Sequence, residues 1–140
     1  MENLSLLKKY KLFRYFKKIL KENRNVISNK KNGLNLRIDK AYRLYTVVNC
    51  SPDVVKYGKN LAEKEIKEYV TKAEKLFIDV GILEYIGIRD IQQISEVDFL
   101  IVFGYNGFDT TSYYNRLYFL YAICVILGIS ALLFYFFMFF

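Results

Sequence analysis

Residues 117–140 constrain this chain more than any other segment, because these 24 residues hold no charged side chain and are mostly apolar. As an α-helix they would rise about 36 Å, and the hydrocarbon core of a bilayer is about 30 Å thick. A core helix of a soluble domain rarely has so long an uncharged run, and this segment has no polar face to turn toward water. We therefore predict that it is a transmembrane helix.

The place of the span predicts the topology of the protein. The sequence ends with the span, which is typical of a tail-anchored protein, and lysines interrupt the apolar residues near the start, which argues against a signal peptide. Arg116 immediately precedes the span, and a basic flanking residue favours the cytoplasmic side for the N-terminal bulk. We expect a single-pass protein with this orientation, in a cellular, virion or organelle membrane.

Two sets of residues flank or line the predicted span. An aromatic belt at the membrane interface is predicted for the tyrosines Tyr113, Tyr114, Tyr118 and Tyr121. A small-residue patch, where another helix can approach closely, is predicted for Gly128, Ser130 and Ala131.

The rest of the sequence argues against catalysis. Histidine, the commonest general base and the commonest transition-metal ligand, is absent. Cys50 follows a predicted strand and Cys124 lies in the span, so the two cysteines are not expected to pair. Residues 104–111, GYNGFDTT, resemble a functional loop but lack the Gly-Lys-Ser/Thr ending of a phosphate cradle. We expect a non-enzymatic protein with no cofactor, no metal and no small-molecule substrate.

Residues 4–22 are predicted to form a basic amphipathic helix. One arc is apolar and consists of Leu6, Leu12, Phe13, Phe16, Ile19 and Leu20. The opposite arc is basic and consists of Lys8, Lys11, Arg14, Lys17, Lys18 and Lys21. Such a helix suits an anionic membrane surface or a groove on a partner protein. The alternatives are a helix that covers its own domain with a solvated basic face, and a helix whose lysines contact nucleic-acid phosphates.

Positive charge is concentrated in the same part of the chain. Residues 1–43 contain 13 Lys and Arg side chains against three acidic ones, whereas residues 44–140 contain eight against 11. The formal net charge of +7 is therefore a property of the N-terminal third. The partners to be expected are anionic lipid, an acidic protein surface or, as the alternative, nucleic acid.

Three segments in the middle of the chain are predicted to be strands. Residues 41–49 are rich in β-branched and aromatic side chains, and residues 84–94 carry apolar residues with imperfect alternation. Residues 99–105 are apolar on both faces, so this strand is expected to be central and covered on both sides.

One long helix is predicted between these strands, over residues 60–80, with Gly81 just beyond its end. It is expected to cover one face of the sheet, while the other face takes the N-terminal helix or a partner. Residues 23–37, rich in Asn and Lys, are predicted to be a linker. A short helical turn is predicted to be capped by Ser51, to have Pro52 at its first position, and to end at Gly58.

The predicted fold is α+β: a small β-α-β-β soluble domain with an N-terminal basic amphipathic helix and a C-terminal single transmembrane helix. The expected organisation is helix and linker over residues 1–37, the domain over 38–110, and a linker with the anchor over 111–140. We expect a structural subunit or adaptor in a membrane-associated assembly with protein partners. The abundance of residues with AT-rich codons favours a viral or organellar assembly. The alternative is a membrane-tethered nucleic-acid-binding protein that uses the basic N-terminal segment.

Overall fold

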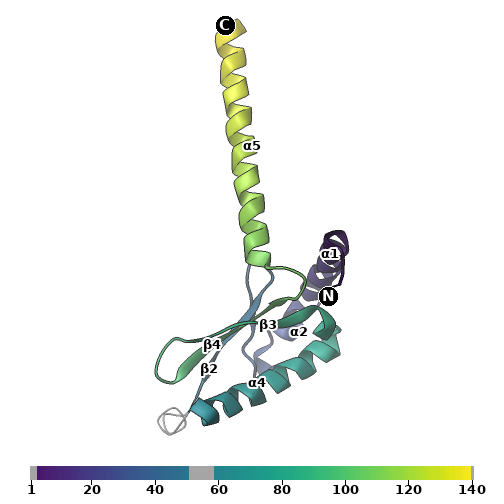
Figure 1. Cartoon of the computed structure of the whole chain (residues 1–140), viewed down its shortest axis with the longest axis vertical. Coiled ribbons are helices and arrows are strands. Elements are labelled where there is room, and N and C mark those ends of the chain that lie inside the picture. Colours follow the sequence, from purple (N-terminus) through teal and green to yellow (C-terminus); the bar gives the residue numbers. More distant parts are fainter. Residues whose placement is uncertain (1–2, 51–58, 140) are drawn as a thin grey trace. The chain divides into compact units, whose positions relative to one another are not determined.

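The computed structural model describes residues 3–50 and 59–139, and the side chains of residues 3–50 and 63–139. The chain divides into two units, Met1–Phe108 and Asp109–Phe140. The predicted turn involving Ser51, Pro52 and Gly58 lies outside the described residues. Figure 1 shows the helices and strands of both units, coloured along the sequence.

The first unit combines helices with a four-stranded antiparallel sheet, which confirms the predicted mixture of helix and sheet. Within residues 3–50 and 59–108 the helices are α1 (Leu6–Glu22), α2 (Arg24–Ile27) and α4 (Lys59–Val80), with 3-10 turns η1 (Lys30–Asn32) and η2 (Leu83–Tyr85). Its strands are β1 (Arg37–Ile38), β2 (Leu44–Asn49), β3 (Ile86–Gln93) and β4 (Asp98–Tyr105), in the spatial order β1-β2-β4-β3. The strand that is apolar on both faces, β4, is therefore internal.

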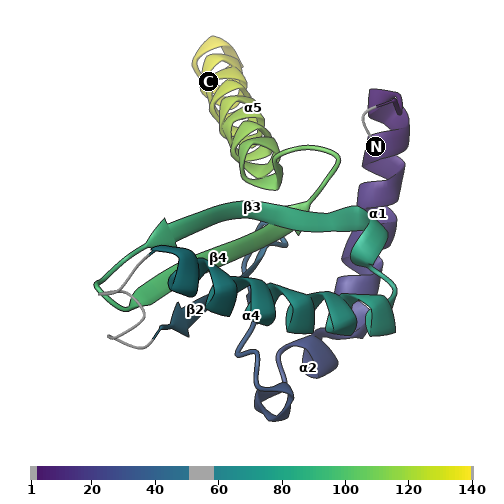
Figure 2. The same cartoon turned by 60° about the horizontal axis from the view of Figure 1, so that its bottom comes forward.

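The core lies between α4 and one face of this sheet (Figure 2). In the β2–β4 register Leu44 lies opposite Phe103 and Thr46 opposite Ile101, and all four side chains are buried. The Phe77 ring of α4 packs edge-on against Phe103 at 5.2 Å between centroids. Side chains two residues apart on a strand share a face, so α4 covers the face that carries Ile101, Phe103 and Tyr105.

The N-terminal helix packs on this same face, whereas the sequence suggested the opposite one. The rings of Phe13 and Phe16 lie 5.2 and 5.6 Å from Tyr105, two residues beyond Phe103 on β4. On the opposite face, the arginine stems that flank Gly104 approach it closely: a Cβ there would lie 2.9 Å from Arg89 Cγ. Aliphatic arginine stems, rather than α1, thus lie over that part of the sheet.

Residues 23–37 are ordered structure and not the open linker that their composition suggested. Ile27, Leu34 and Leu36 are buried in the core of the first unit. The asparagines shape the turns, since Asn32 donates to the carbonyl of Ile27 at 3.0 Å and accepts from the backbone of Leu34 at 2.9 Å. The carbonyl of Leu34 in turn accepts from the Thr46 and Tyr69 hydroxyls, at 3.0 and 2.5 Å.

Helix α4 ends at the predicted glycine. Gly81 has φ of +80°, the left-handed conformation that a side chain disfavours. Its N–H donates to Ile78 at 3.1 Å, and the N–H of Ile82 donates to Phe77 at 2.9 Å, which is the Schellman pattern. The buried Ile82 then directs the chain back into the core toward β3.

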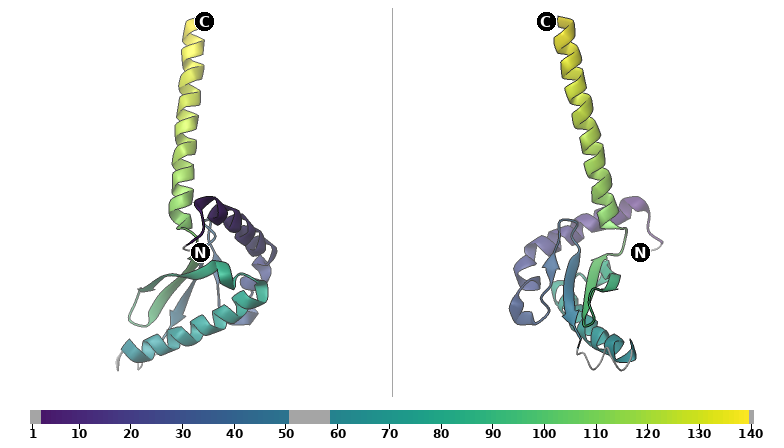
Figure 3. Two further views of the ribbon diagram at one scale, coloured as in Figure 1. Left: turned by 45° about the vertical axis from the view of Figure 1, so that its right-hand side comes forward. Right: turned by 90° about the vertical axis from the view of Figure 1, so that its left-hand side faces the viewer.

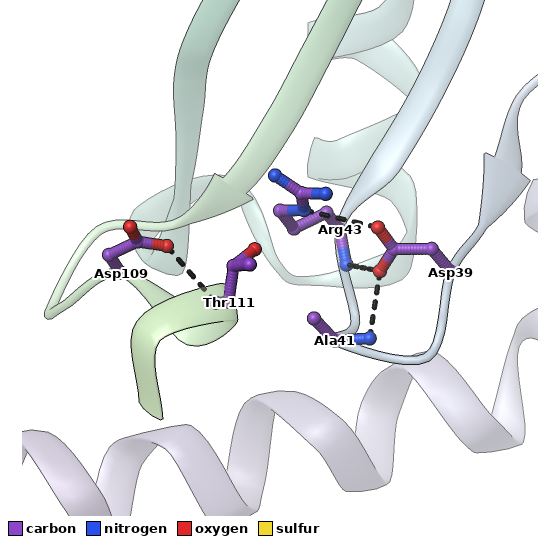
Figure 4. Close-up of polar contacts among 5 residues, drawn as sticks. All are labelled: Asp39, Ala41, Arg43, Asp109 and Thr111. Atoms are coloured by element: carbon purple, nitrogen blue, oxygen red, sulfur yellow. Dashed lines mark hydrogen bonds and ion pairs between the residues drawn. The ribbon is translucent and has the colours of Figure 1, made fainter. Parts of the chain in front are cut away.

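The second unit is one uninterrupted helix, α5 (Thr110–Phe139), of 30 residues (Figure 3). It begins earlier than predicted, so the expected linker around residues 111–116 is helical. The cause is an N-cap: Asp109 accepts a hydrogen bond from the backbone of Thr111 at 3.0 Å (Figure 4). The same carboxylate accepts a second one from the Ser112 hydroxyl at 3.1 Å.

Candidate functional site

Helix α5 presents an apolar surface to solvent along its length. Every described side chain from residue 115 to 139 is exposed, including the aromatic Phe137, which is 80% exposed. None of the most apolar 18 residues of the helix is buried. A core helix of a soluble protein would instead be buried, and exposing so much apolar area to water is unfavourable. Helix α5 is long and apolar enough to cross a membrane and is therefore a candidate span.

The predicted interfacial tyrosines cluster at the start of the apolar run. The Tyr113 and Tyr114 rings lie 5.1 Å apart, and those of Tyr114 and Tyr118 lie 6.4 Å apart, one turn along the same side. They flank Arg116, the last charged residue of the sequence. Tyrosine beside a basic residue is the composition that favours a membrane–water interface.

The helix brings together only part of the predicted small-residue patch. Gly128 and Ala131 are three residues apart and share one side of α5, whereas Ser130 lies about 160° around the axis from Gly128. A Cβ on Gly128 would meet no atom within 4 Å. Gly128 and Ala131 therefore offer a narrow site of close approach, and Ser130 faces elsewhere.

Apart from Leu6, the apolar arc of α1 packs in the core of the first unit. Phe13, Phe16 and Leu20 are at most 1% exposed, and Leu12 is half-buried. The Phe13 ring lies 5.0 Å from that of Phe108 in addition to its contact with Tyr105. Any contact of α1 with lipid or with a partner is thus left to its other side chains.

The basic arc of α1 is on the surface. Most of its side chains are exposed, namely Lys8, Lys11, Arg14, Lys18 and Lys21. Lys17 is half-buried, and its Nζ lies 4.9 Å from the Phe13 ring centroid and 5.7 Å from that of Tyr42. The Lys21 Nζ also lies 5.7 Å from the Tyr42 centroid. These cation–π contacts hold Lys17 and Lys21 against the domain. The exposed side chains of Lys8, Lys11, Arg14 and Lys18 form a positive surface.

Sequence reasoning did not predict that two leucines in the first turn of α1 are exposed. Leu6 is 63% exposed and Leu7 is 67% exposed. Helical periodicity placed Leu6 with the side chains that are in fact buried, and gave Leu7 no role. The signal in the sequence was their position: both precede Lys8 and Lys9, so apolar and basic side chains adjoin there.

The loop that resembled a functional loop holds the first unit together. The Tyr105 hydroxyl donates to the carbonyl of Lys9 at 2.5 Å, which ties α1 to the end of β4. Asn106 donates to Ile86 at 3.1 Å, and the Arg89 guanidinium donates to the carbonyls of Tyr105 and Phe108. These polar groups form hydrogen bonds within the first unit, so their role in the structure is to hold its elements together.

A turn before β2 is organised by one acidic side chain. Asp39 accepts from the backbone N–H groups of Ala41 and Arg43, both at 2.9 Å, and its other oxygen lies 3.1 Å from Arg43 Nε (Figure 4). Tyr42 at its centre has φ of +58°. The aspartate fixes a strained turn and is not available for chemistry.

Two shallow hollows of the first unit do not resemble catalytic pockets. One, of about 300 Å³, is lined by Tyr15, Ile78, Gly81, Leu83, Glu84 and Tyr85. The other, of about 390 Å³, is lined by Asn35, Arg37, Tyr45, Thr46 and Val47. Neither brings two carboxylates together, and the described residues contain no cluster of three potential metal ligands.

The thiol of Cys50 is buried, and its pKa is raised. Burial, followed by a hydrogen bond to Glu65 and the negative charges of Glu65 and Asp98, raises its pKa from 9.0 to about 11. In the unfolded chain the thiol ionises first, so this group's contribution to the free energy of unfolding falls between pH 9 and pH 11. We expect urea titrations of wild type to show a steeper loss of stability across this window than titrations of Cys50→Ala. Equal slopes would contradict this assignment.

Comparison of the chain with models of protein families, with curated proteins and with solved structures finds no match. The two features that remain as candidates for function are the apolar surface of α5 and the basic, leucine-tipped surface of α1. The first suits hydrocarbon and the second suits an anionic surface.

Proposed function

We propose that this protein is a membrane-anchored structural subunit or adaptor, without catalytic activity, in a membrane-associated assembly. The observation that carries the proposal is the fully exposed apolar surface of α5, which has no charged residue after Arg116. In this function α5 crosses the bilayer once, and the first unit stands at the cytoplasmic face. A viral or organellar membrane is the proposed setting.

The proposed orientation is supported by Arg116 and by the basic surface of α1. Basic residues close to a span favour the cytoplasmic side, where the leaflet is also the more anionic one. Lysines exposed on α1 would then face headgroups or an acidic partner protein.

A second candidate is a membrane-tethered nucleic-acid-binding protein. Its support is the composition of positions 1–43, which contain 13 basic residues and only three acidic ones. The apolar arc of α1 does not discriminate between the candidates, because packing in the domain core accounts for it. Both candidates use α5 as the anchor, so the choice between them depends on what the basic surface of α1 binds.

Topology and assembly can be tested together in membranes that contain the full chain. We expect the chain to resist alkaline carbonate extraction, and protease added from the cytoplasmic side to remove the first unit while protecting α5. In mild detergent we expect migration in a complex well above the 16.6 kDa chain with its micelle. A chain that is extracted by carbonate would contradict the anchor, and a monomer would contradict the role in an assembly.

The nucleic-acid candidate has its own signature. Several phosphate contacts would give tight binding of RNA or DNA that weakens steeply with salt. We expect the full chain in neutral nanodiscs to bind neither polymer measurably at physiological salt. Tight, steeply salt-dependent binding would favour the second candidate.

A further inference from the structure

The exposed leucine pair, Leu6 and Leu7, is the largest apolar feature of α1 that the domain core does not cover. The pair is 63% and 67% exposed, while Phe13 and Phe16 on the same helix are at most 1% exposed. Ser5 caps the helix by accepting from the backbone of Lys8 at 3.4 Å, so both leucines stand on ordered helix. Exposed leucines on ordered backbone lose little conformational entropy on binding.

The leucine pair adjoins exposed positive charge. Lys8 and Lys11 are exposed on the same first turns, and no acidic side chain follows the pair until Glu22. A protein groove could accept two leucines, but it would have to be acidic at its rim as well. An anionic bilayer offers both properties at once: headgroup charge, and hydrocarbon just beneath it.

Contacts inside the first unit connect the helix that carries the leucine pair to Phe108, the last residue of that unit. The Tyr10 ring packs on Phe108 at 4.9 Å, and the Tyr105 hydroxyl holds the carbonyl of Lys9. Phe108 is two residues before α5 begins. Two peptide links and two helical turns span roughly 18 Å, so the covalent chain limits how far Phe108 can be from Leu117, whatever the orientation of α5.

We propose that Leu6 and Leu7, with Lys8 and Lys11 beside them, form a second membrane contact that inserts into the headgroup layer of an anionic bilayer. This inference rests on the proposed anchoring by α5 and adds a lipid preference to it. Two contacts, one spanning and one interfacial, would hold the first unit against the membrane surface instead of leaving it free on a tether.

Tryptophan fluorescence tests this contact, because the chain has no tryptophan of its own. The full chain is placed in nanodiscs, with or without phosphatidylserine. Their lipids carry bromine near the headgroup end of the acyl chains for the variants of the first unit, and near the methyl end for the variant in the middle of α5. Three single-tryptophan variants report on different sites: Leu7→Trp, Leu127→Trp in α5, and Ile78→Trp, which replaces a 59% exposed side chain of α4. We expect about twofold quenching of Leu7→Trp in anionic discs, much less in neutral discs, and none of Ile78→Trp.

Replacing lysines with glutamates tests whether the leucine pair meets lipid because the neighbouring lysines are attracted to anionic headgroups, or only because the pair lies near the membrane. In the Leu7→Trp background, Lys8→Glu with Lys11→Glu should abolish quenching, whereas Lys64→Glu with Lys67→Glu on the exposed side of α4 should leave it unchanged. Unquenched Leu7→Trp beside quenched Leu127→Trp would overturn this contact and leave the anchor intact. Unquenched Leu127→Trp would overturn the anchor, and this contact with it. A blue shift without quenching would mean that protein covers the leucines, which also overturns the inference.

Discussion

Two lysines at the middle of α5, in Ile126→Lys with Leu127→Lys, should release the chain from membranes. Each lysine near the bilayer centre costs about 2.5 to 3.5 kcal/mol, so the pair costs about 5 to 7 kcal/mol. The apolar side chains of residues 117–140 favour insertion by only several kcal/mol in total, at about 0.3 to 0.6 kcal/mol each. The two terms are similar in size, so we expect most of the double variant in the soluble or aggregated fraction after flotation.

The matched control places the same two charges on exposed apolar residues of the first unit. Ile78 and Leu83 are 59% and 37% exposed, so Ile78→Lys with Leu83→Lys adds equal charge without touching α5. This control should float with membranes as the wild type does. Co-flotation of the Ile126→Lys and Leu127→Lys variant would mean that another part of the chain, or a partner, holds it to lipid.

The central parts of the first unit could be predicted because their patterns admit few alternatives. Residues 99–105 are apolar on both faces, which requires an internal strand, and β4 is internal. Gly81 follows a periodic helix and adopts the positive φ that ends it. The long uncharged run of α5 is the strongest signal in the sequence, and its exposure in the structure agrees with it.

The imperfect alternation of β3 has a physical cause that a sequence pattern does not reveal. Ile88 lies opposite Phe103 and Ile91 opposite Ile101, so these two isoleucines share a face although they are three residues apart. A bulge between Ile88 and Asp90 restores the alternation. One extra residue in a strand is invisible to a period-two pattern.

The role of α1 could not be predicted because an amphipathic pattern does not name the surface that it meets. The same arc suits lipid, a partner groove or the helix's own domain. The surface that α1 meets is determined by Tyr105, which is nearly a hundred residues away in the sequence. Its ring packs on Phe13 and Phe16, and its hydroxyl donates to the carbonyl of Lys9. The asparagine-rich stretch after α1 was predicted to be a linker for a related reason. Its three buried apolar residues, Ile27, Leu34 and Leu36, are too few and too unevenly spaced to form a helical or strand period.

Phe16→Ala should strongly destabilise the first unit. Phe16 is fully buried, and its ring packs 5.6 Å from Tyr105 and 6.4 Å from Phe13. Truncating a buried phenylalanine costs about 3 to 5 kcal/mol, and small domains are stable by about 5 to 15 kcal/mol. We expect urea unfolding of the first unit, followed by tyrosine fluorescence in nanodiscs, to shift to a much lower midpoint. Tyr15→Ala is the neighbouring control, because Tyr15 is 52% exposed and its ring contacts the Tyr85 ring. We expect its free energy of unfolding to fall far less than that of Phe16→Ala, by no more than about 0.5 kcal/mol plus the small contribution of the Tyr85 contact.

The comparison of these two variants also decides which face of α1 serves the domain. If α1 used its apolar arc on lipid, Phe16→Ala would weaken membrane contact and leave the stability of the first unit unchanged. The structure predicts the reverse, because Phe16 is in the core while Leu6, Leu7 and most of the lysines of α1 are exposed. A large loss of stability in Phe16→Ala, with unchanged flotation through α5, would establish that α1 is an integral part of the domain and only its outer side is free to bind. An unchanged urea midpoint would show that α1 does not dock on the sheet in this way.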